Sequence, residues 1–240
     1  MLNIMKKILL LLSVFLLSTN VICFAKNVKV TVMPEDASIY VDNNFAGKGA
    51  VVVNIKQKEG HVRVRLEKEG YVTRRLKLKA DEKRKAIDIE LEKDEAWDAS
   101  TNTNLANKFF TIPVSEKYIA NSGSKEEAAK LAWKQLHQIL LKYIEEIEES
   151  NMLGGYIQSA WVVKKFYHSS LNDIDGGIQW RTRVTIKESS SGDNLEYRVK
   201  ISSEVAPLNS DVEEYFQPTQ RVLKSFEPMI SEFQARLGSI

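Results

Sequence analysis

The sequence predicts a two-part protein: an all-β N-terminal sandwich module, then an α+β domain with two helices packed on an antiparallel sheet. Three patterns carry this prediction. Apolar and polar residues alternate through residues 26–92, a stretch with helical periodicity starts near residue 125, and alternation returns after residue 155. The chain has 240 residues, of which 43% are hydrophobic, so it can form two cores.

Residues 1–25 have the features of a secretory signal. Lys6 and Lys7 precede an apolar run from Ile8 to Leu17, and Cys23 and Ala25 stand three places and one place before a predicted cut. A membrane anchor would need about 18 to 20 consecutive apolar residues, and serine, threonine and asparagine interrupt this run. We expect cleavage after Ala25, export to the periplasm or cell surface, and no stable membrane span afterwards.

The sole cysteine, Cys23, leaves a second possibility for this segment. Lipidation of Cys23 would make the protein a lipoprotein, but Ile22 and Asn20 stand where such sites have a small and an aliphatic residue. Cleavage after Ala25 instead leaves a chain without cysteine, which has neither disulfides nor thiolate metal sites.

Charge is balanced overall after signal removal. The 34 basic residues fall to 32 and equal the 32 acidic residues. Residues 26–92 carry 15 basic and 11 acidic residues, and residues 93–240 carry 17 and 21. A surplus of four charges is small for nucleic-acid attachment, so we expect no nucleic-acid partner.

The N-terminal module, residues 26–92, is expected to contain about six short strands. Pro34, Asn43, Gly60 and Gly70 mark the turns between them. Apolar residues spaced two apart mark the strands: Val28–Val32, Ile39–Val41, Val51–Ile55, Val62–Leu66, Leu76–Leu78 and Ile87–Leu91. One buried face on each strand predicts a small sandwich.

Several short motifs in this module carry a family resemblance. Residues 32–42 read VMPEDASIYVD, Gly47 follows, and GHVRV at 60–64 and KEGY at 68–71 complete the pattern. Over residues 27–92 the chain resembles the PEGA domain, a bacterial β-sandwich module. The resemblance implies an interaction or spacer module of envelope and surface proteins, and it brings no catalytic residues.

Phe45 is the candidate contact residue of this module. It follows the turn at residues 42–44, where an exposed aromatic ring can stack on a sugar or fill a partner's pocket. The alternative is that the ring folds back onto the edge of the sandwich.

Residues 93–107 are polar and are expected to form a linker, with Trp97 at the domain boundary. The second domain, residues 108–240, opens with a strand over 109–114 that Pro113 places at a sheet edge. Ser124 and Glu127 then form a capping box for a helix over about 125–149.

Four glutamates end that predicted helix, and a second helix is expected at the C-terminus. The carboxylates Glu145, Glu146, Glu148 and Glu149 would lie at the negative end of the helix dipole. A divalent cation, a basic patch on a partner or simple solvation could compensate them. The C-terminal helix should start near Pro218, kink at Pro228 and end near Gly238.

Three strands are expected between these helices, at residues 156–167, 177–188 and 195–205. The last two form a hairpin across residues 189–194, with one apolar face. The opposite face carries five basic residues: Arg181, Arg183, Lys187, Arg198 and Lys200.

The expected register of this hairpin brings like charges together. A turn centred near residues 191–192 pairs Arg183 with either Arg198 or Lys200, which destabilises the hairpin. We hypothesise that this basic face holds an anionic ligand or an acidic partner. The alternative is an open face whose side chains extend into water.

Catalysis is not expected. The only histidines are His61, His137 and His168, and none stands in a nucleophile elbow or at metal-ligand spacing from another. The acidic stretch at residues 173–177 resembles a hairpin turn more than a calcium loop. We therefore expect no enzyme, no cofactor and no metal site.

The sequence favours an exported envelope adaptor that binds an envelope polymer or a partner protein. The alternative is a periplasmic carrier of a small apolar ligand, whose cavity in the C-terminal domain would be lined by Trp133, Trp161 and Trp180. A packed core also explains these tryptophans.

Overall fold

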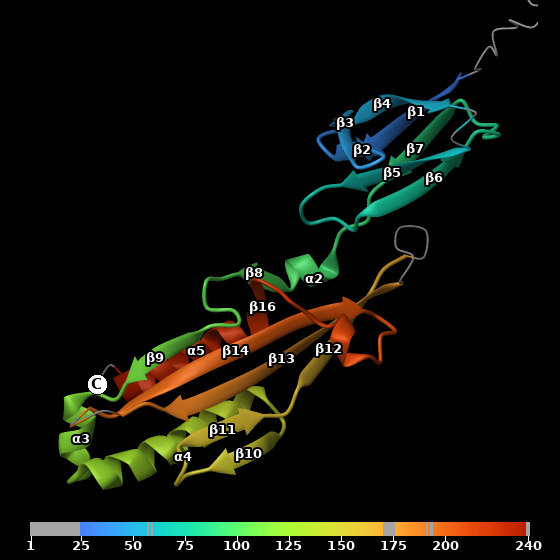
Figure 1. The fold of residues 1–240 in the computed structure, drawn as a ribbon. Coiled ribbons are helices and arrows are strands. Elements are labelled where there is room, and N and C mark those ends of the chain that lie inside the picture. The colour runs from blue at the N-terminus through green and yellow to red at the C-terminus, as the bar shows by residue number, and fades with distance from the viewer. Residues whose placement is uncertain are drawn as a thin grey trace, which may run out of the picture. The chain divides into compact units, whose positions relative to one another are not determined.

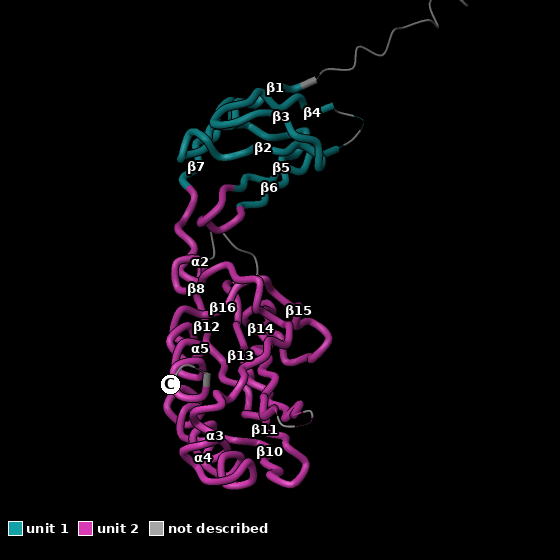
Figure 2. The backbone as a smooth tube through the Cα atoms, turned by 90° about the vertical axis from the view of Figure 1, so that its left-hand side faces the viewer, with its two compact units in different colours: residues 1–67, 74–90 teal, residues 68–73, 91–240 magenta. Residues whose placement is uncertain are grey.

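The computed structural model describes residues 25–56, 58, 60–169, 176–190, 192 and 194–238. These residues form two compact units (Figure 2). Unit 1 comprises the described residues up to Glu67 together with Arg74–Glu90, and unit 2 comprises Lys68–Thr73 and the described residues from Leu91 onward. The predicted signal through residue 24 and residues 173–175 of the turn predicted at 173–177 lie outside the described residues.

Unit 1 is a sandwich of two β-sheets, which confirms the all-β prediction for this part. One sheet has the order β4-β1-β7, with β1 (Ala25–Met33), β4 (Ala50–Lys56) and β7 (Ala86–Glu90). The other has the order β3-β2-β5-β6, with β2 (Ser38–Val41), β3 (Asn44–Lys48), β5 (His61–Glu67) and β6 (Arg74–Lys79). Alternate residues of both sheets are fully buried, as Val30, Ile39 and Val64 illustrate.

Strand β3 is an addition to the six strands expected. Asp42 and Asn43 both have positive φ, 47° and 68°, which is the conformation of a two-residue hairpin turn. The strand that follows reads Asn-Phe-Ala-Gly-Lys. It has no apolar alternation, so the sequence pattern does not predict a strand there. Gly49, just beyond it, has φ 69°, and a Cβ there would lie 2.4 Å from the carbonyl oxygen of Glu35.

Unit 2 is built on an antiparallel sheet of seven strands within the described residues (Figure 1). Its main path is β10-β11-β13-β14-β15, while β12 pairs with β13 and β9 pairs with β14. The strands are β9 (Phe109–Pro113), β10 (Ile147–Asn151), β11 (Tyr156–Ser159), β12 (Val162–Tyr167), β13 (Gly177–Glu188), β14 (Glu196–Pro207) and β15 (Gln217–Pro218). A small second sheet joins β8 (Ser100–Asn102) to β16 (Arg221–Leu223).

Helices cover one face of this sheet. The α-helices are α2 (Glu95–Asp98), α3 (Glu116–Ser122), α4 (Lys125–Tyr143) and α5 (Glu227–Phe233), with a π-helical turn at Gln234–Gly238 and 3-10 turns at Glu213–Tyr215 and Lys224–Phe226. Leu136 and Leu140 of α4 and Phe233 of α5 share one core cluster with Val184 and Tyr197 of the sheet. Strands make up most of the ordered structure, so the α+β layout is confirmed in part. No helix among the described residues has the length and apolarity to span a membrane.

Helix α4 ends earlier than predicted. Ile144 is extended, with φ −135° and ψ 128°, and is 2% exposed in the core. The chain then forms β10 at Ile147–Asn151, so Glu148 and Glu149 lie on a strand and not at a helix end. Two physical reasons agree: carboxylates are unfavourable at a helix C-terminus, and a buried β-branched residue fits extended backbone.

The C-terminal helix is also shorter than predicted. Helix α5 begins at Glu227, and Pro228 lies in its first turn, where a proline needs no intrahelical partner and causes no kink. Residues 218 and 221–223, expected in the helix, belong to the paired strands β15 and β16.

The segment expected as a linker, residues 93–107, contains α2 and β8 and packs within unit 2. Asp94 caps α2, since its carboxylate accepts hydrogen bonds from the backbone N–H groups of Ala96 (2.9 Å) and Trp97 (3.2 Å). The Trp97 ring lies 3.6 Å from the guanidinium carbon of Arg221. Ala96 and Ala106 are buried in the core.

Ser124 is the N-cap of α4, as predicted, whereas the Glu127 carboxylate pairs with Lys130 at 2.6 Å instead of completing the predicted capping box. The cap yields a stability test. Ser124 Oγ accepts a hydrogen bond from Glu127 N at 3.2 Å. We expect Ser124→Ala to lower the free energy of unfolding by about 1 kcal/mol, because it removes the acceptor for this N–H. Ser124→Asp keeps an acceptor and should unfold at nearly the wild-type urea concentration. Equal losses in the two variants would contradict this account of the cap.

Candidate ligand-binding face

The β13–β14 hairpin sets the positions of the five basic residues predicted on its outer face. Lys187 pairs with Arg198, whereas Arg183 pairs with Ser202. The expected pairing of Arg183 with Arg198 or Lys200 is therefore wrong. The turn is centred between residues 192 and 193, further along the chain than expected. Each residue of β13 therefore pairs with a residue further along β14 than expected, but the same residues remain on each face of the hairpin.

The apolar face of the hairpin forms the core, as the sequence predicted. Trp180, Val184 and Ile186 of β13 are at most 3% exposed, as are Tyr197, Val199 and Ile201 of β14. The outer face therefore carries the basic residues of both strands.

Arg181 is buried on this outer face and is not presented to solvent. Its guanidinium lies 4.2 Å from the ring of Trp161 and 3.7 Å from that of Phe216. Arg181 donates hydrogen bonds to the carboxylates of Glu204 (2.8 Å from Nε) and Glu213 (2.6 Å from Nη1). The bond to Glu213 raises the pKa of Arg181 and lowers the pKa of Glu213. We call these five residues the Arg181 clamp.

Arg183 is partly engaged. Its guanidinium lies 4.4 Å from the ring of Trp161, which also contacts Arg181, and its Nη1 lies 3.9 Å from Glu148 Oε2. The Arg183 side chain is 28% exposed, and its Nε is buried without a hydrogen-bond partner among the described residues. Arg183 therefore retains some capacity to bind an additional acceptor.

Lys187, Arg198 and Lys200 form the open part of the face, together with two aromatic residues. Lys187 Nζ lies 5.5 Å from the Tyr156 ring and 5.7 Å from the Phe109 ring. The Arg198 guanidinium lies 5.0 Å from the Phe109 ring, and Lys200 pairs with Phe109 across β14 and β9. We call these five residues the basic cluster.

The basic cluster has no acidic counterpart in the described part of the chain. Lys187 and Arg198 are both exposed, stand directly opposite each other, and make no ion pair with a described carboxylate. Sequence reasoning missed Phe109 and Tyr156, because they come from β9 and β11 and only the strand pairing brings them beside the hairpin. The alternation of residues along these two predicted strands was the sequence signal that could have indicated their face of the sheet.

Phe45 lies in unit 1, apart from this cluster in the chain. It is on strand β3 and not at the tip of a turn, is 59% exposed, and packs edge-on against Tyr40 with ring centroids 5.7 Å apart. The ring therefore contacts the sandwich and still presents surface to solvent.

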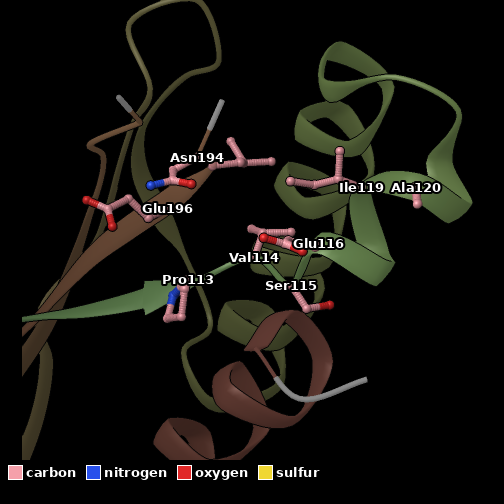
Figure 3. Close-up of a pocket in the computed structure, with 9 residues that line it drawn as sticks. Pro113, Val114, Ser115, Glu116, Ile119, Ala120, Asn194 and Glu196 are labelled. Atoms are coloured by element: carbon pink, nitrogen blue, oxygen red, sulfur yellow. The ribbon is translucent and has the colours of Figure 1, made fainter. Parts of the chain in front are cut away.

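The three tryptophans of the carrier alternative do not line one cavity. Trp133 and Trp180 pack in the core, whereas Trp161 lies on the outer face beside Arg181. A cavity of about 600 Å³ lies instead between the end of β9, α3 and the start of β14 (Figure 3). Its lining contains no tryptophan and includes two acidic side chains; the lining residues are Pro113, Val114, Ser115, Glu116, Ile119, Ala120, Asn194, Leu195 and Glu196.

Acidic and histidine side chains do not gather into a metal site within the described ranges. These residues contain no group of three or more His, Cys, Asp or Glu side chains that could hold a metal ion. His137 is engaged locally, with Nδ1 3.0 Å from the Trp133 carbonyl oxygen and Nε2 2.8 Å from Ser150 Oγ.

Comparison with known proteins confirms the N-terminal resemblance. Residues 25–95 match the family model of the PEGA domain. No curated protein matches the chain. Among solved structures, one from Bacteroides fragilis NCTC 9343, described as a "putative membrane-associated protein of unknown function", shares 11% identity with a TM-score of 0.26, over 81% of this chain and 98% of that chain. That likeness is too weak to carry an argument. The PEGA match supports the coarse class of envelope-associated protein.

Proposed function

We propose that this chain is an exported, non-catalytic envelope adaptor that binds an anionic envelope polymer through the basic cluster of unit 2. One observation carries the proposal: Lys187 and Arg198 face each other across β13 and β14, exposed and without a carboxylate partner among the described residues. Like charges directly opposite destabilise a sheet by up to about 1 kcal/mol, so this arrangement is better explained by an anion that binds between them.

The aromatic members of the cluster indicate what kind of anion fits. Tyr156 and Phe109 lie on the two sides of the Lys187–Arg198 pair, within 6 Å of their cationic groups. Flat apolar rings beside cations suit a ligand with sugar or other carbon groups between its charges. The PEGA domain, which the resemblance associates with envelope and surface proteins, supports an envelope location.

Co-sedimentation with isolated cell envelopes tests this function. Purified residues 26–240 are expected to pellet with envelopes at low salt, to remain bound after the envelopes are treated with protease, and to be released at moderate salt. Loss of binding after protease treatment would instead identify a protein partner, and an absence of binding would contradict the proposal.

Lys187→Glu is the variant that ties this binding to the cluster. The introduced carboxylate would stand opposite Arg198, and this favourable pair offsets the lost contact with the aromatic rings, so stability should stay within about 0.5 kcal/mol of wild type. Envelope binding should fall about tenfold, which corresponds to about 1.4 kcal/mol.

Lys134→Glu is the matched control. Lys134 is exposed on α4, on the helical side of unit 2, and its replacement makes the same change in net charge. We expect envelope binding of this variant within twofold of wild type. An equal loss in the two variants would show that only net charge matters.

A further inference from the structure

Unit 1 has a basic face of its own, on the outer side of the β3-β2-β5-β6 sheet. In the β5–β6 hairpin, Arg63 pairs with Lys77 and Arg65 pairs with Arg75, so two successive outward pairs join like charges. The third outward pair joins His61 to Lys79. The residues between them, such as Val62, Val64 and Leu78, are at most 2% exposed and face the core.

An aromatic pair extends this face across the sheet. Register places Phe45, Tyr40, Arg65 and Arg75 in one row across β3, β2, β5 and β6. The Arg65 guanidinium lies 4.3 Å from the Tyr40 ring, and the Tyr40 and Phe45 rings pack edge-on. We define the unit 1 basic face as Tyr40, Phe45, Arg63, Arg65, Arg75, Lys77 and Lys79.

Little of this charge is neutralised within the described residues. Glu67 accepts a hydrogen bond from Arg65 Nη1 at 2.6 Å. Arg63, Arg75, Lys77 and Lys79 are exposed and make no ion pair with a described carboxylate. Cations that stand opposite one another without counter-charges are unfavourable for the isolated sheet.

Protection of a sheet edge explains only part of this pattern. Strand β6 is at the edge of its sheet, and lysines on an edge strand discourage pairing with other chains. Arg63 and Arg65, however, lie on β5, between β2 and β6. A requirement to protect the edge does not account for cations on an interior strand.

We propose that the unit 1 basic face binds a linear polymer that carries repeated phosphate groups. The cations form two columns along β5 and β6, and residues 75–79 of β6 extend about 13 Å at 3.3 Å per residue, so the face suits an extended chain of anions better than one small anion. A tetrahedral phosphate offers oxygens to both columns at once, and the planar guanidinium groups of arginine match it with two parallel hydrogen bonds. The Tyr40–Phe45 pair offers a surface for the carbon groups that separate the phosphates.

This site is independent of the basic cluster of unit 2, and the test is designed to separate them. Full-length mature chain, residues 26–240, is titrated with fluorescently labelled long-chain inorganic polyphosphate in the Lys187→Glu background. Binding should persist in that background and weaken at least tenfold between low and moderate salt. If Lys187→Glu alone abolishes binding, the inference fails while the function proposed for unit 2 stands.

Arg75→Glu/Lys77→Glu, added to that background, is the decisive variant. Each new glutamate stands opposite an arginine of β5, so the hairpin gains two favourable pairs and should remain folded, which thermal unfolding checks. We expect polyphosphate affinity to fall at least tenfold. Lys29→Glu/Lys83→Glu makes the same change in net charge at exposed positions outside the face and should stay within threefold.

Three results would overturn the inference: absence of polyphosphate binding, equal losses in the two double variants, or equally tight binding of poly-L-glutamate. The first two would show that the face is not a binding site. The third would show that it takes any polyanion and has no preference for phosphate.

Discussion

Replacement of Arg181 by methionine is expected to lower the free energy of unfolding of unit 2 by about 3 kcal/mol. Arg181 is 7% exposed and holds Glu204 by two donors, while its guanidinium lies between two aromatic rings. Methionine fills much of the space between the rings but leaves the Glu204 carboxylate, which is 20% exposed, without its partner. Loss of one member of a buried ion pair costs about 3 to 5 kcal/mol, and the solvent around the two carboxylates places the effect at the lower end. Urea denaturation of the whole chain measures it.

Glu204→Gln and Glu213→Gln divide this effect between the two carboxylates. The side chain of Glu213 is 76% exposed, so its neutralisation should cost clearly less than that of Glu204. A larger loss for Glu213→Gln would contradict the burial argument. Both variants keep Arg181 between the aromatic rings, which makes them suitable controls for Arg181→Met.

The clamp also predicts how stability responds to acid. The hydrogen bond from Arg181 lowers the folded-state pKa of Glu213 below its usual 4.5. A carboxyl group with a lowered pKa contributes its full stabilisation above pH 4.5 and loses it as the pH falls through the folded-state value. Wild type should therefore lose this contribution below pH 4.5, and Glu213→Gln should lack that part of the pH dependence in thermal unfolding.

Asn107→Ala is expected to lower the free energy of unfolding by about 3 kcal/mol. The Asn107 side chain donates to the carbonyl oxygens of Ser203 (3.0 Å) and Thr219 (2.9 Å) and accepts from Ser203 N (2.9 Å). Its backbone N–H donates to Ile201 O at 2.8 Å. The variant leaves Ser203 N and Thr219 O without this partner, while Ser203 O still accepts from Thr219 N at 3.0 Å. It also places alanine at φ 60°, a left-handed conformation that costs about 1 kcal/mol.

Asn107→Gly separates these two contributions. Glycine adopts φ 60° without steric cost, so this variant should lose about 2 kcal/mol, the part due to the side-chain hydrogen bonds. Urea denaturation of the two variants side by side measures the difference. Equal losses would mean that the backbone conformation contributes nothing, and a near-wild-type glycine variant would show that these hydrogen bonds are not stabilising.

Local patterns predicted the elements whose determinants lie close together in sequence. The alternation in unit 1 and the cap at Ser124 correspond to observed strands and to the observed start of α4. Both depend on residues within a few positions of one another. The end of α4 depended on the burial of Ile144 in the core, which no local pattern shows.

The candidate site was predictable only in part for the same reason. The alternation of residues predicts that Lys187 and Arg198 lie on one face. Which cations stand opposite each other depends on the register, and the register depends on where the long turn is centred. Alternation alone places Arg181 with the exposed cations. Its burial depends on Glu213, which is 32 residues away in sequence and is not indicated by any local pattern. The like-charge pairs of unit 1 are not predictable from alternation alone. Alternation places Arg63 and Arg65 on the outward face of β5, but their partners on β6 follow only from the strand pairing.

The chain passes between the two compact units at three points, after residues 67, 73 and 90. The loop between β5 and β6 therefore has its partners in unit 2: Asp94 N donates to Gly70 O at 3.0 Å, and Val72 N donates to Glu92 O at 2.8 Å. A fragment that ends at residue 90 would contain every strand of the sandwich and still lack the groups that hold this loop. The matched PEGA region, residues 25–95, contains both of these partners, whereas compact unit 1 ends at Glu90. Substitutions in the whole chain therefore test the sandwich more cleanly than a fragment that ends at residue 90.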